Sequence, residues 1–425
     1  MDGKGSIQMN VLLISTSECE GGGAIAARRL MDALTANGVE AKMMVRDKQS
    51  DDPNVIKIGN KLPKLLERLA IMPHTGLNRS RHWQTDIANT GFDITSTEAF
   101  READIIHLHW INQGFLSLNI IRKILTSGKP VVWTMHDMWE FTGICHYPGD
   151  CDKYRTECGE CPLLKSKKMN DLANRTFRKK SDVYQGTEVR FAAVSSWLAR
   201  CAKESKLLSG QSVEVIPNVL PLSQFVIKDK KEARKQLGLP EDKTIIVFGA
   251  FKIEDSRKGF AYLKEALQLL TERGTFTKEQ LHLALFGGLK HPEILTGLPV
   301  ASTYLGYVDG ENELPALYSA ADAAAIPSRY ETFGQTVIEA QACGCLPVTF
   351  TGSGQMDIIT HKQDGYLADY LSPEDFANGL QWAISHPVDK ALMRQNVVKK
   401  YSEETIASKY ITLYETALHH SDSHL

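Results

Sequence analysis

Residues 327–340 read PSRYETFGQTVIEA, a segment that places two carboxylates eight residues apart around the expected start of a helix. Gly334 opens an apolar-periodic run, and Gly344 stands where helices commonly end in a left-handed glycine. We therefore predict a helix of roughly ten residues between these glycines. Glu331 precedes this helix and Glu339 lies within it. If the whole span were helical, the carboxylates would be about 12 Å apart, with the unpaired N–H groups of the first turn between them.

This spacing is typical of a nucleotide-sugar site. The N–H groups at a helix start favour an anion, so a diphosphate held there would put a hexose near Glu331 and a ribose near Glu339. The carboxylates of glycosidases flank a single bond at about 5 to 9.5 Å, which is closer than this spacing most naturally gives. The alternative is a pair of carboxylates exposed on a surface helix.

The length and composition of the chain limit the number of domains and the classes of function that are expected. A chain of 425 residues is too long for one ordinary core, and two domains of about 200 residues are expected. With 49 Lys and Arg against 51 Asp and Glu, the composition predicts no nucleic-acid partner. Residues 1–8 are polar and lack the apolar core of a secretory signal, and no apolar run approaches membrane-spanning length. We expect a cytoplasmic protein, in which cysteines are free thiols or metal ligands rather than disulfides.

Short apolar runs alternate twice with helical patterns, which predicts an α/β fold of two Rossmann-like, doubly wound domains facing across a cleft. We place the first domain at 1–220, the second at 221–400 and the linker near 218–228. The helical segment at 391–419 is longer than the second sheet needs, so 401–425 is expected to pack back on the first domain. The predicted strands are 11–15, 39–45, 105–109, 131–136, 189–194, 213–216, 244–251, 281–286, 303–305, 323–326 and 346–350, and the predicted helices include 24–37, 260–273 and 314–321.

Two features of the first half point to a ligand. A strand-to-helix turn contains three consecutive glycines, and at Gly22 and Gly23 a ligand can approach the backbone closely. The turn lacks the dinucleotide-binding GxGxxG pattern, and a plain glycine-rich turn is the alternative. His136 ends an otherwise apolar strand and precedes an acidic residue, so we expect it to face the ligand. For His107, in a neighbouring strand, a hydrogen-bonded core position is predicted instead.

The strand-to-helix connection at 248–260 carries three cations. Cations at a strand end can neutralise a diphosphate leaving group as its charge develops. The alternative is a solvated loop. Two later strand ends, 286–288 and 305–308, supply glycines beside which a nucleotide base would fit, and Tyr307 lies in the second of them. The three cations are Lys252, Arg257 and Lys258.

Taken together, these motifs resemble the family 4 glycosyltransferases, which have the two-domain GT-B fold. The specific element is the pair of glutamates with seven residues between them, Glu331 and Glu339. The resemblance implies that Glu339 holds the ribose, and that Glu331 with the amides of Phe333 and Gly334 holds the sugar and phosphate. Weaker matches are the glycines at 21–23, Thr134 with His136, 216–218, 257–259 and Gly306.

The resemblance further implies the reaction. Lys258 would bind the diphosphate, and His136 would sit beside the reacting centre. Family members transfer a sugar with retention, often without a catalytic metal, so protein cations neutralise the leaving group. Ala250 stands where many relatives have Arg, which leaves Lys252 or Arg257 to supply a second cation, and the usual Gly-Gly-x-Pro-Glu loop is replaced by GSGQMD at 352–357.

We accordingly expect a retaining hexosyltransferase that uses a nucleoside-diphosphate sugar and a glycan or lipid-linked glycan acceptor. Two alternatives remain open. One is another GT-B chemistry, such as phosphorolysis or sugar-nucleotide epimerisation. The other is a non-catalytic protein that binds a nucleotide sugar or a glycan.

Four cysteines fall within residues 145–161. The C-x2-C end with two further thiols predicts a closed, tetrahedral site for a structural zinc ion, and no catalytic metal is expected. The loop resembles that of a branch of family 4 that includes colanic-acid and capsular polysaccharide transferases. This resemblance implies a role in surface polysaccharide assembly and places the loop on the acceptor side. The expected zinc ligands are Cys145, Cys151, Cys158 and Cys161.

Two stretches are of the kind that rests on an anionic membrane. Residues 62–72 mix apolar side chains with Lys64 and Arg68, and basic residues cluster after the cysteine loop. Such stretches predict peripheral contact with the inner face of the membrane, where a lipid-linked acceptor would be met. A solvated helix face is the usual alternative. The basic residues after the loop are Lys165, Lys167, Lys168, Arg175, Arg178, Lys179 and Lys180.

Overall fold

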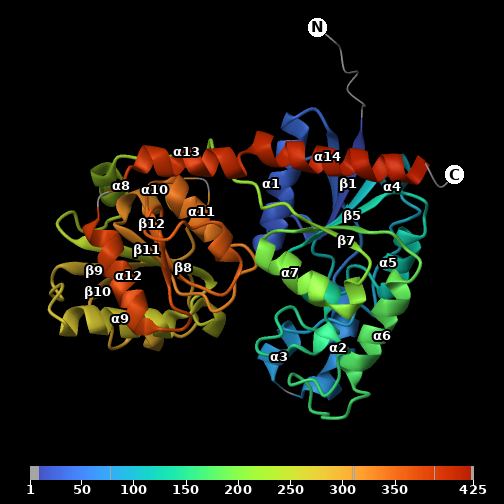
Figure 1. The fold of residues 1–425 in the computed structure, drawn as a ribbon, viewed down its shortest axis with the longest axis horizontal. Coiled ribbons are helices and arrows are strands. Elements are labelled where there is room, and N and C mark those ends of the chain that lie inside the picture. Colours follow the sequence, from blue (N-terminus) through green and yellow to red (C-terminus); the bar gives the residue numbers. More distant parts are fainter. Residues whose placement is uncertain (1–8, 77, 309, 311, 387, 423–425) are drawn as a thin grey trace, which may run out of the picture. The chain divides into compact units, whose positions relative to one another are not determined.

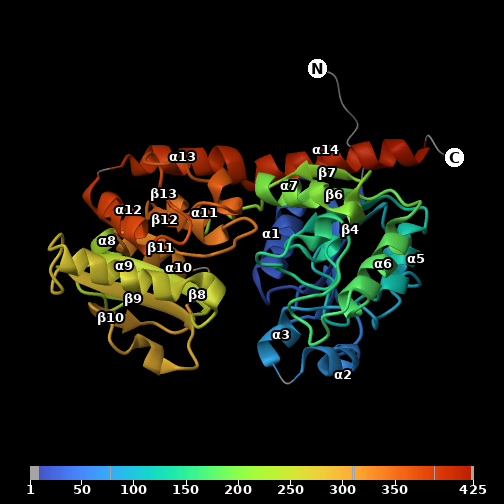
Figure 2. The same ribbon diagram turned by 60° about the horizontal axis from the view of Figure 1, so that its bottom comes forward.

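The computed structural model describes residues 9–422, apart from 77, 309, 311 and 387. The chain forms two compact units: the first runs to Val219 and resumes at Ile406, and the second spans Leu220–Thr405. The polar segment at residues 1–8 lies outside the described residues. Figure 1 and Figure 2 show that each unit has a twisted sheet covered by helices.

The first unit contains a seven-stranded parallel sheet in the order β3-β2-β1-β4-β5-β6-β7. Its strands are almost continuously apolar, as in β1, because helices cover both faces. The sequence pattern predicted every strand except the three-residue β3. The strands are β1 (Asn10–Ser17), β2 (Glu40–Asp47), β3 (Val55–Lys57), β4 (Ile105–Leu108), β5 (Val131–Met135), β6 (Arg190–Ala193) and β7 (Ser212–Val215).

Helices α1 and α14 pack on one face of this sheet, and α5 and α6 pack against each other elsewhere in the unit. The last helix, α14, begins at the end of the second unit's sequence and enters the first unit at Ile406. The helices are α1 (Gly22–Ala36), α2 (Leu62–Thr75), α3 (Arg79–Trp83), α4 (Glu98–Glu102), α5 (Leu118–Leu125), α6 (Leu172–Tyr184), α7 (Ser196–Glu204) and α14 (Glu403–Asp422).

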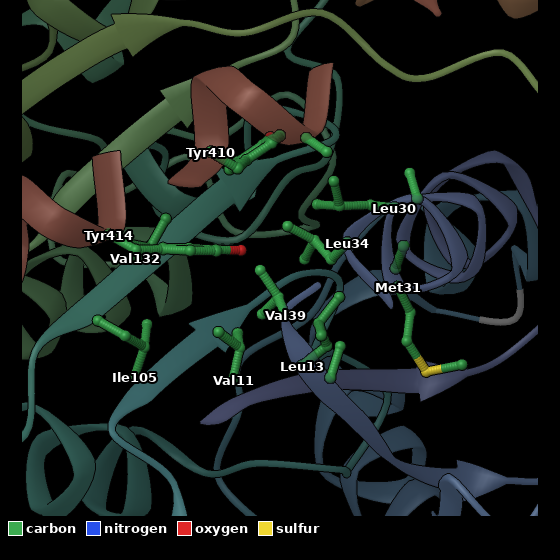
Figure 3. Close-up of a cluster of buried hydrophobic side chains, with 14 of the residues drawn as sticks. Val11, Leu13, Leu30, Met31, Leu34, Val39, Ile105, Val132, Tyr410 and Tyr414 are labelled. Atoms are coloured by element: carbon green, nitrogen blue, oxygen red, sulfur yellow. The ribbon is translucent and has the colours of Figure 1, made fainter. Parts of the chain in front are cut away.

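Figure 3 shows how α14 contributes to the core of the first unit. Tyr410 and Tyr414 from this helix are buried in one cluster with Leu13 of β1 and Leu34 of α1. The predicted single helical segment at the C-terminal end is in fact two helices. Ser402 adopts an extended conformation between α13 and α14, which separates the two helices.

The second unit has a six-stranded parallel sheet in the order β10-β9-β8-β11-β12-β13. Helices α9 and α12 pack together on one face, and α8, α10 and α11 cover the other. The sequence analysis missed β13. The strands are β8 (Thr244–Lys252), β9 (Leu281–Gly288), β10 (Ala301–Tyr304), β11 (Ala323–Ile326), β12 (Leu346–Phe350) and β13 (Tyr366–Ala368). The helices are α8 (Lys230–Gln236), α9 (Phe260–Glu272), α10 (Glu313–Ala320), α11 (Gln335–Ala342), α12 (Pro373–Ser385) and α13 (Lys390–Tyr401).

Both sheets confirm the predicted doubly wound α/β class. The strand order reverses between β1 and β4 in the first unit, and between β8 and β11 in the second. In such sheets ligands bind outside the carboxyl ends of the strands at the reversal point. Among the residues described, no helix is both long enough and apolar enough to cross a membrane.

Candidate functional site

The reversal point of the second unit brings Lys258 and Glu331 together. Lys258 ends a short 3-10 turn, Ser256–Lys258, that follows β8, and Glu331 lies in the loop after β11. The Lys258 Nζ donates to Glu331 Oε1 at 2.5 Å. The two loops are also joined through the backbone, since the Arg329 N–H donates to the Arg257 carbonyl at 2.7 Å. The predicted cation loop and the first glutamate are therefore neighbours in space.

A glycine permits this close approach of the two loops. Gly259 has a φ of +73°, and a Cβ built there would lie 1.8 Å from the Pro327 carbonyl oxygen. Any side chain at this position would both strain the backbone and collide with a backbone atom. The placement of Lys258 beside Glu331 thus depends on the residue that follows Lys258.

Glu331 is held in the ionised form. Burial by itself raises the pKa of this carboxyl, but the charge of Lys258 and hydrogen bonds from Lys258 and Ser328 outweigh it, so the pKa lies below its ordinary value of 4.5. An ionised carboxylate accepts hydrogen bonds only, which suits it to a sugar's hydroxyl groups.

Two residues of segment 352–357, to which the sequence analysis assigned no role, hold the backbone of Glu331. Its N–H donates to Ser353 Oγ at 3.2 Å, and its carbonyl accepts from the Gly354 N–H at 2.8 Å. Both partners lie in the loop that replaces the family's usual Gly-Gly-x-Pro-Glu segment. A signal existed in the sequence, because the glycines around Ser353 follow directly after a predicted strand.

The predicted helix beyond Glu331 is confirmed as α11 and is slightly shorter than expected. Its N-cap is Gly334, with a φ of +113° and no side-chain cap, and Gly344 follows its C-terminal end with a φ of +76°. Glu339 lies within the helix and is 5% exposed. A helix start without a capping side chain can receive an anion from solution.

The remaining residues predicted at this edge differ in exposure. The Phe333 side chain is buried against Tyr401, so only the Phe333 backbone can meet a ligand. Tyr307 is 67% exposed, and its hydroxyl donates to the Phe251 carbonyl, which precedes the exposed Lys252. Arg257 pairs with Asp255 at 2.7 Å. Of the three cations predicted after β8, Arg257 and Lys258 are thus partly neutralised by carboxylates, whereas Lys252, the last residue of β8, is exposed.

In the first unit, the glycine turn and His136 meet. Helix α1 begins at Gly22, and a Cβ built at Gly23 would lie 3.1 Å from His136 Cγ. His136 Nε2 lies 2.9 Å from His109 Nδ1, and the two rings are stacked. His109 follows β4 and His136 follows β5, so neighbouring strand ends place both imidazoles beside the glycine turn.

Three histidines in this region are kept neutral by burial. Burial lowers the pKa of His136 to about 4, against a smaller opposing effect of the Asp137 charge. Burial also lowers the pKa of His107 to about 3, and holds that of His109 well below 6.5. His107 is fully buried, with Nδ1 2.7 Å from the Tyr414 hydroxyl and Nε2 2.8 Å from Thr134 Oγ1. The prediction of a hydrogen-bonded core histidine is confirmed.

The cysteine loop does not form the expected metal site. Cys145, Cys151, Cys158 and Cys161 all line one cavity of about 20 Å³. Within the ranges that the structure describes, however, no three His, Cys, Asp or Glu side chains are placed to hold a metal ion. The zinc prediction is therefore not supported.

An ion-paired histidine anchors this loop instead. His146 Nδ1 lies 2.8 Å from Asp137 Oδ2, and its Nε2 lies 2.9 Å from Asp86 Oδ2. Burial alone lowers the pKa of His146, but the two carboxylates raise it to about 10. Asp137 also accepts from Trp110 Nε1 at 2.8 Å. The imidazolium thus ties the loop to the residue that follows His136.

Comparisons with known proteins agree with this architecture. A model described as Glycosyltransferase Family 4 matches residues 20–224, and a model described as Glycosyl transferases group 1 matches residues 229–404. An uncharacterized glycosyltransferase of Methanocaldococcus jannaschii is 28% identical over 373 residues, which cover 81% of this chain and 92% of that protein.

Solved structures show the same fold at low identity. Sucrose-phosphate synthase from Thermosynechococcus elongatus has a TM-score of 0.66 and 20% identity, over 96% of this chain and 99% of that chain. HepE from Anabaena was solved in complex with UDP and glucose. It has a TM-score of 0.61 and 14% identity, over 96% of this chain and 100% of that chain. With one family model on each unit and glycosyltransferase folds among its structural neighbours, the chain belongs to the family 4 glycosyltransferases and has the GT-B fold.

Proposed function

We propose that this glycosyltransferase is a retaining hexosyltransferase that moves a hexose from a nucleoside-diphosphate sugar to a glycan or lipid-linked glycan. The proposal places it in surface polysaccharide assembly, in the cytoplasm at the inner face of the membrane. The observation that carries it is the Lys258–Glu331 pair at the strand reversal of the second unit, followed by the uncapped start of α11.

The second unit is proposed to bind the donor. Glu339 would hold the ribose, and the start of α11 would receive the diphosphate together with Lys258, assisted by Arg257 or Lys252. Glu331 would accept from hydroxyls of the hexose. Tyr307 would lie beside the base. The complex of HepE with UDP and glucose supports uracil as the first base to test.

The first unit is proposed to present the acceptor. In the transfer step, the acceptor oxygen forms a bond to the anomeric carbon on the face from which the diphosphate departs, while the bond to the diphosphate breaks. The departing phosphate oxygen takes the acceptor's proton. With a pKa of about 4, His136 is a weak base, so its proposed role is a hydrogen bond to the transferring sugar.

The cations act on the leaving group. In the free protein Lys258 is paired with Glu331, which keeps the ammonium in place before the donor binds. As the bond to the diphosphate breaks, negative charge grows on the phosphate oxygens next to Lys258. A preorganised cation stabilises that charge more than it stabilises the ground state, which lowers the barrier.

The test has a binding step and a turnover step. A thermal-shift screen against UDP, GDP, ADP and their sugars identifies the donor, because a ligand at about a hundred times its dissociation constant stabilises by about 2.7 kcal/mol. Lys258→Met and Glu331→Gln are each expected to lower turnover by about 100-fold or more. Glu293→Gln, at an exposed carboxylate of the same unit, serves as the control. Full activity in both site variants contradicts the assignment.

Product analysis separates the alternatives. A phosphorylase would release a sugar phosphate, and an epimerase would return an altered nucleotide sugar. Persistent binding without turnover across a broad acceptor panel would favour a non-catalytic binding protein.

A further inference from the structure

Helix α2 has its apolar and polar faces reversed relative to the core. An amphipathic helix of a globular protein normally buries its apolar stripe. Here the residues facing inward are Glu67, Ile71 and Thr75, each at most 1% exposed. Leucines at i, i+3, i+4 and i+7 face outward instead. The exposed side chains are Leu62 (58%), Leu65 (56%), Leu66 (47%), Leu69 (50%) and Met72 (40%), and Trp83 of α3 is 52% exposed.

This grouping is not a random scatter of surface residues. Sixteen large apolar side chains are exposed among the described residues, and six of them lie between positions 62 and 83. Singly exposed apolar residues need no explanation, whereas a contiguous group marks a surface that something covers. Figure 1 and Figure 2 both place α2 and α3 at the end of the first unit farthest from α14.

Polar contacts lock the helix in this orientation. Glu67 Oε1 accepts from the N–H groups of Ile87 and Ala88, at 2.9 and 2.6 Å. Arg68 donates to Asp86 Oδ1 and to the Thr85 carbonyl, both at 2.7 Å. Rolling α2 to bury its leucines would break these bonds and expose their partners, so the outward apolar face is a built feature.

Cations border this face. From residue 61 to residue 83 the only acidic residue is Glu67, which is buried. Lys61 is exposed, and Lys64 Nζ lies 5.1 Å from the centre of the Trp83 ring. A second segment arrives from beyond the cysteine loop, because the Lys165 N–H donates to the His74 carbonyl at 2.8 Å. That segment, 163–170, has no acidic residue, and its exposed side chains include Lys165, Lys167, Lys168 and Met169.

We propose that this surface, the α2 patch, docks on an anionic phospholipid bilayer. The patch comprises the exposed apolar residues of α2 with Trp83, bordered by Lys61, Lys64, Lys165, Lys167 and Lys168. Leucines and Met72 enter the boundary between headgroups and acyl chains, and Trp83 lies at headgroup depth, where its amphipathic ring is favoured. The lysines keep their ammonium groups in water and attract anionic headgroups.

The location of the patch connects it to the first unit's strand ends. Asp86, which binds Arg68 of α2, also binds His146, and His146 binds Asp137 next to His136. The patch is therefore joined through buried ion pairs to the edge of the sheet at which His136 lies. An acceptor carried by a lipid in the same bilayer would be delivered near that edge. The α2 patch thus supplies the contact surface for the location at the inner face of the membrane given in the proposed function, although docking itself needs no transfer chemistry.

The test is co-sedimentation of the full chain with vesicles, without donor or acceptor. One vesicle is phosphatidylcholine alone, and the other contains about one third phosphatidylglycerol. Leu65→Gln with Leu69→Gln is expected to lower partitioning by about tenfold or more. The matched control is Leu392→Gln with Val398→Gln, two exposed apolar residues of α13, and it should partition like the unaltered protein. Unchanged thermal unfolding verifies that both variants fold.

A charge variant separates electrostatic attraction to anionic lipids from nonspecific apolar binding. Changing Lys165, Lys167 and Lys168 to Gln should weaken binding to the anionic vesicles by about fivefold per lysine and leave binding to phosphatidylcholine unchanged. The proposal is overturned if the unaltered protein binds neither vesicle, or if the leucine variant binds as well as the control. It is equally overturned if the leucine variant only converts a dimer to a monomer in sedimentation velocity, because a second copy would then cover the patch. Failure of the transferase assignment would leave these outcomes unaffected.

Discussion

The buried neutral histidines of the first unit are predicted to make an acid-sensitive contribution to its stability. Glu67 and His146 act in the opposite direction, because their raised pKa values favour the folded state as the pH falls. The pKa values of His107 and His136 are lowered from 6.5 to about 3 and about 4, and that of His109 is lowered as well. A group whose pKa is depressed by folding takes up its proton more readily when the chain unfolds. Its stabilising contribution is therefore complete above about pH 6.5 and is lost as the pH falls towards the folded-state values.

The magnitude follows from the pKa values. About pH 5 lies about 1.5 units below the ordinary pKa of an imidazole. At this pH, each imidazole that stays neutral in the folded state lowers the free energy of unfolding by about 2 kcal/mol. For His107 and His136 together the loss is about 4 kcal/mol, and His109 acts in the same direction. A domain is stable by about 5 to 15 kcal/mol, so a contribution of this size is large enough to be isolated by comparing variants.

Urea unfolding followed by tryptophan fluorescence measures this effect, because five of the six tryptophans lie in the first unit. His107→Gln should reduce the loss between about pH 7.5 and about pH 5 by about 2 kcal/mol, even though it lowers stability at neutral pH. His291→Gln, whose side chain is 65% exposed, is the control and should leave the pH dependence unchanged. The five tryptophans are Trp83, Trp110, Trp133, Trp139 and Trp197.

Two results would refute this reasoning. One is a pH dependence that the control His291→Gln alters as much as His107→Gln does. The other is an unchanged pH dependence in His107→Gln, which would mean that the acid sensitivity arises from other groups.

Two further variants test contacts within the first unit. Tyr414→Phe should lower the free energy of unfolding of the first unit by about 1 to 3 kcal/mol in urea titrations, because the buried His107 Nδ1 loses its partner. The control is Tyr370→Phe, at a 42% exposed residue, which should change stability by less than about 0.5 kcal/mol. Gly23→Ala should lower transferase activity more than Gly22→Ala does in a steady-state assay. Of the two glycines, only Gly23 would bring a Cβ against the His136 ring. Equal effects of the two substitutions would contradict a role for this contact.

Many of the elements around the candidate site of the second unit could be predicted from the sequence. Alternating apolar runs and helical patterns are local signals, so the strands that became β8 and β11 and the helix that became α11 were predicted close to their observed bounds. The glycines that bracket α11 also mark local backbone geometry. These features depend on residues within a few positions of one another, and the chain encodes them directly.

Contacts between distant segments needed the tertiary structure. Lys258 and Glu331 are 73 residues apart, and they meet because β8 and β11 are adjacent in the sheet although β9 and β10 lie between them in sequence. His107 and Tyr414, 307 residues apart, meet because α14 returns to the first unit. The order of strands in a sheet and the packing of α14 on the first unit leave no periodic pattern in the sequence.

The same distinction explains two surprises. A thiol spacing predicted a metal site at Cys145, Cys151, Cys158 and Cys161, but spacing cannot show whether buried thiols reach a ligand geometry. The pattern of residues 62–75 indicated an amphipathic helix, yet only the bonds of Glu67 and Arg68 decided that its leucines face outward. Neighbouring residues set which segments form strands, helices and glycine turns, so these features could be predicted without the fold. The tertiary structure decided which side chains pair and which faces are buried, because both depend on how remote segments pack.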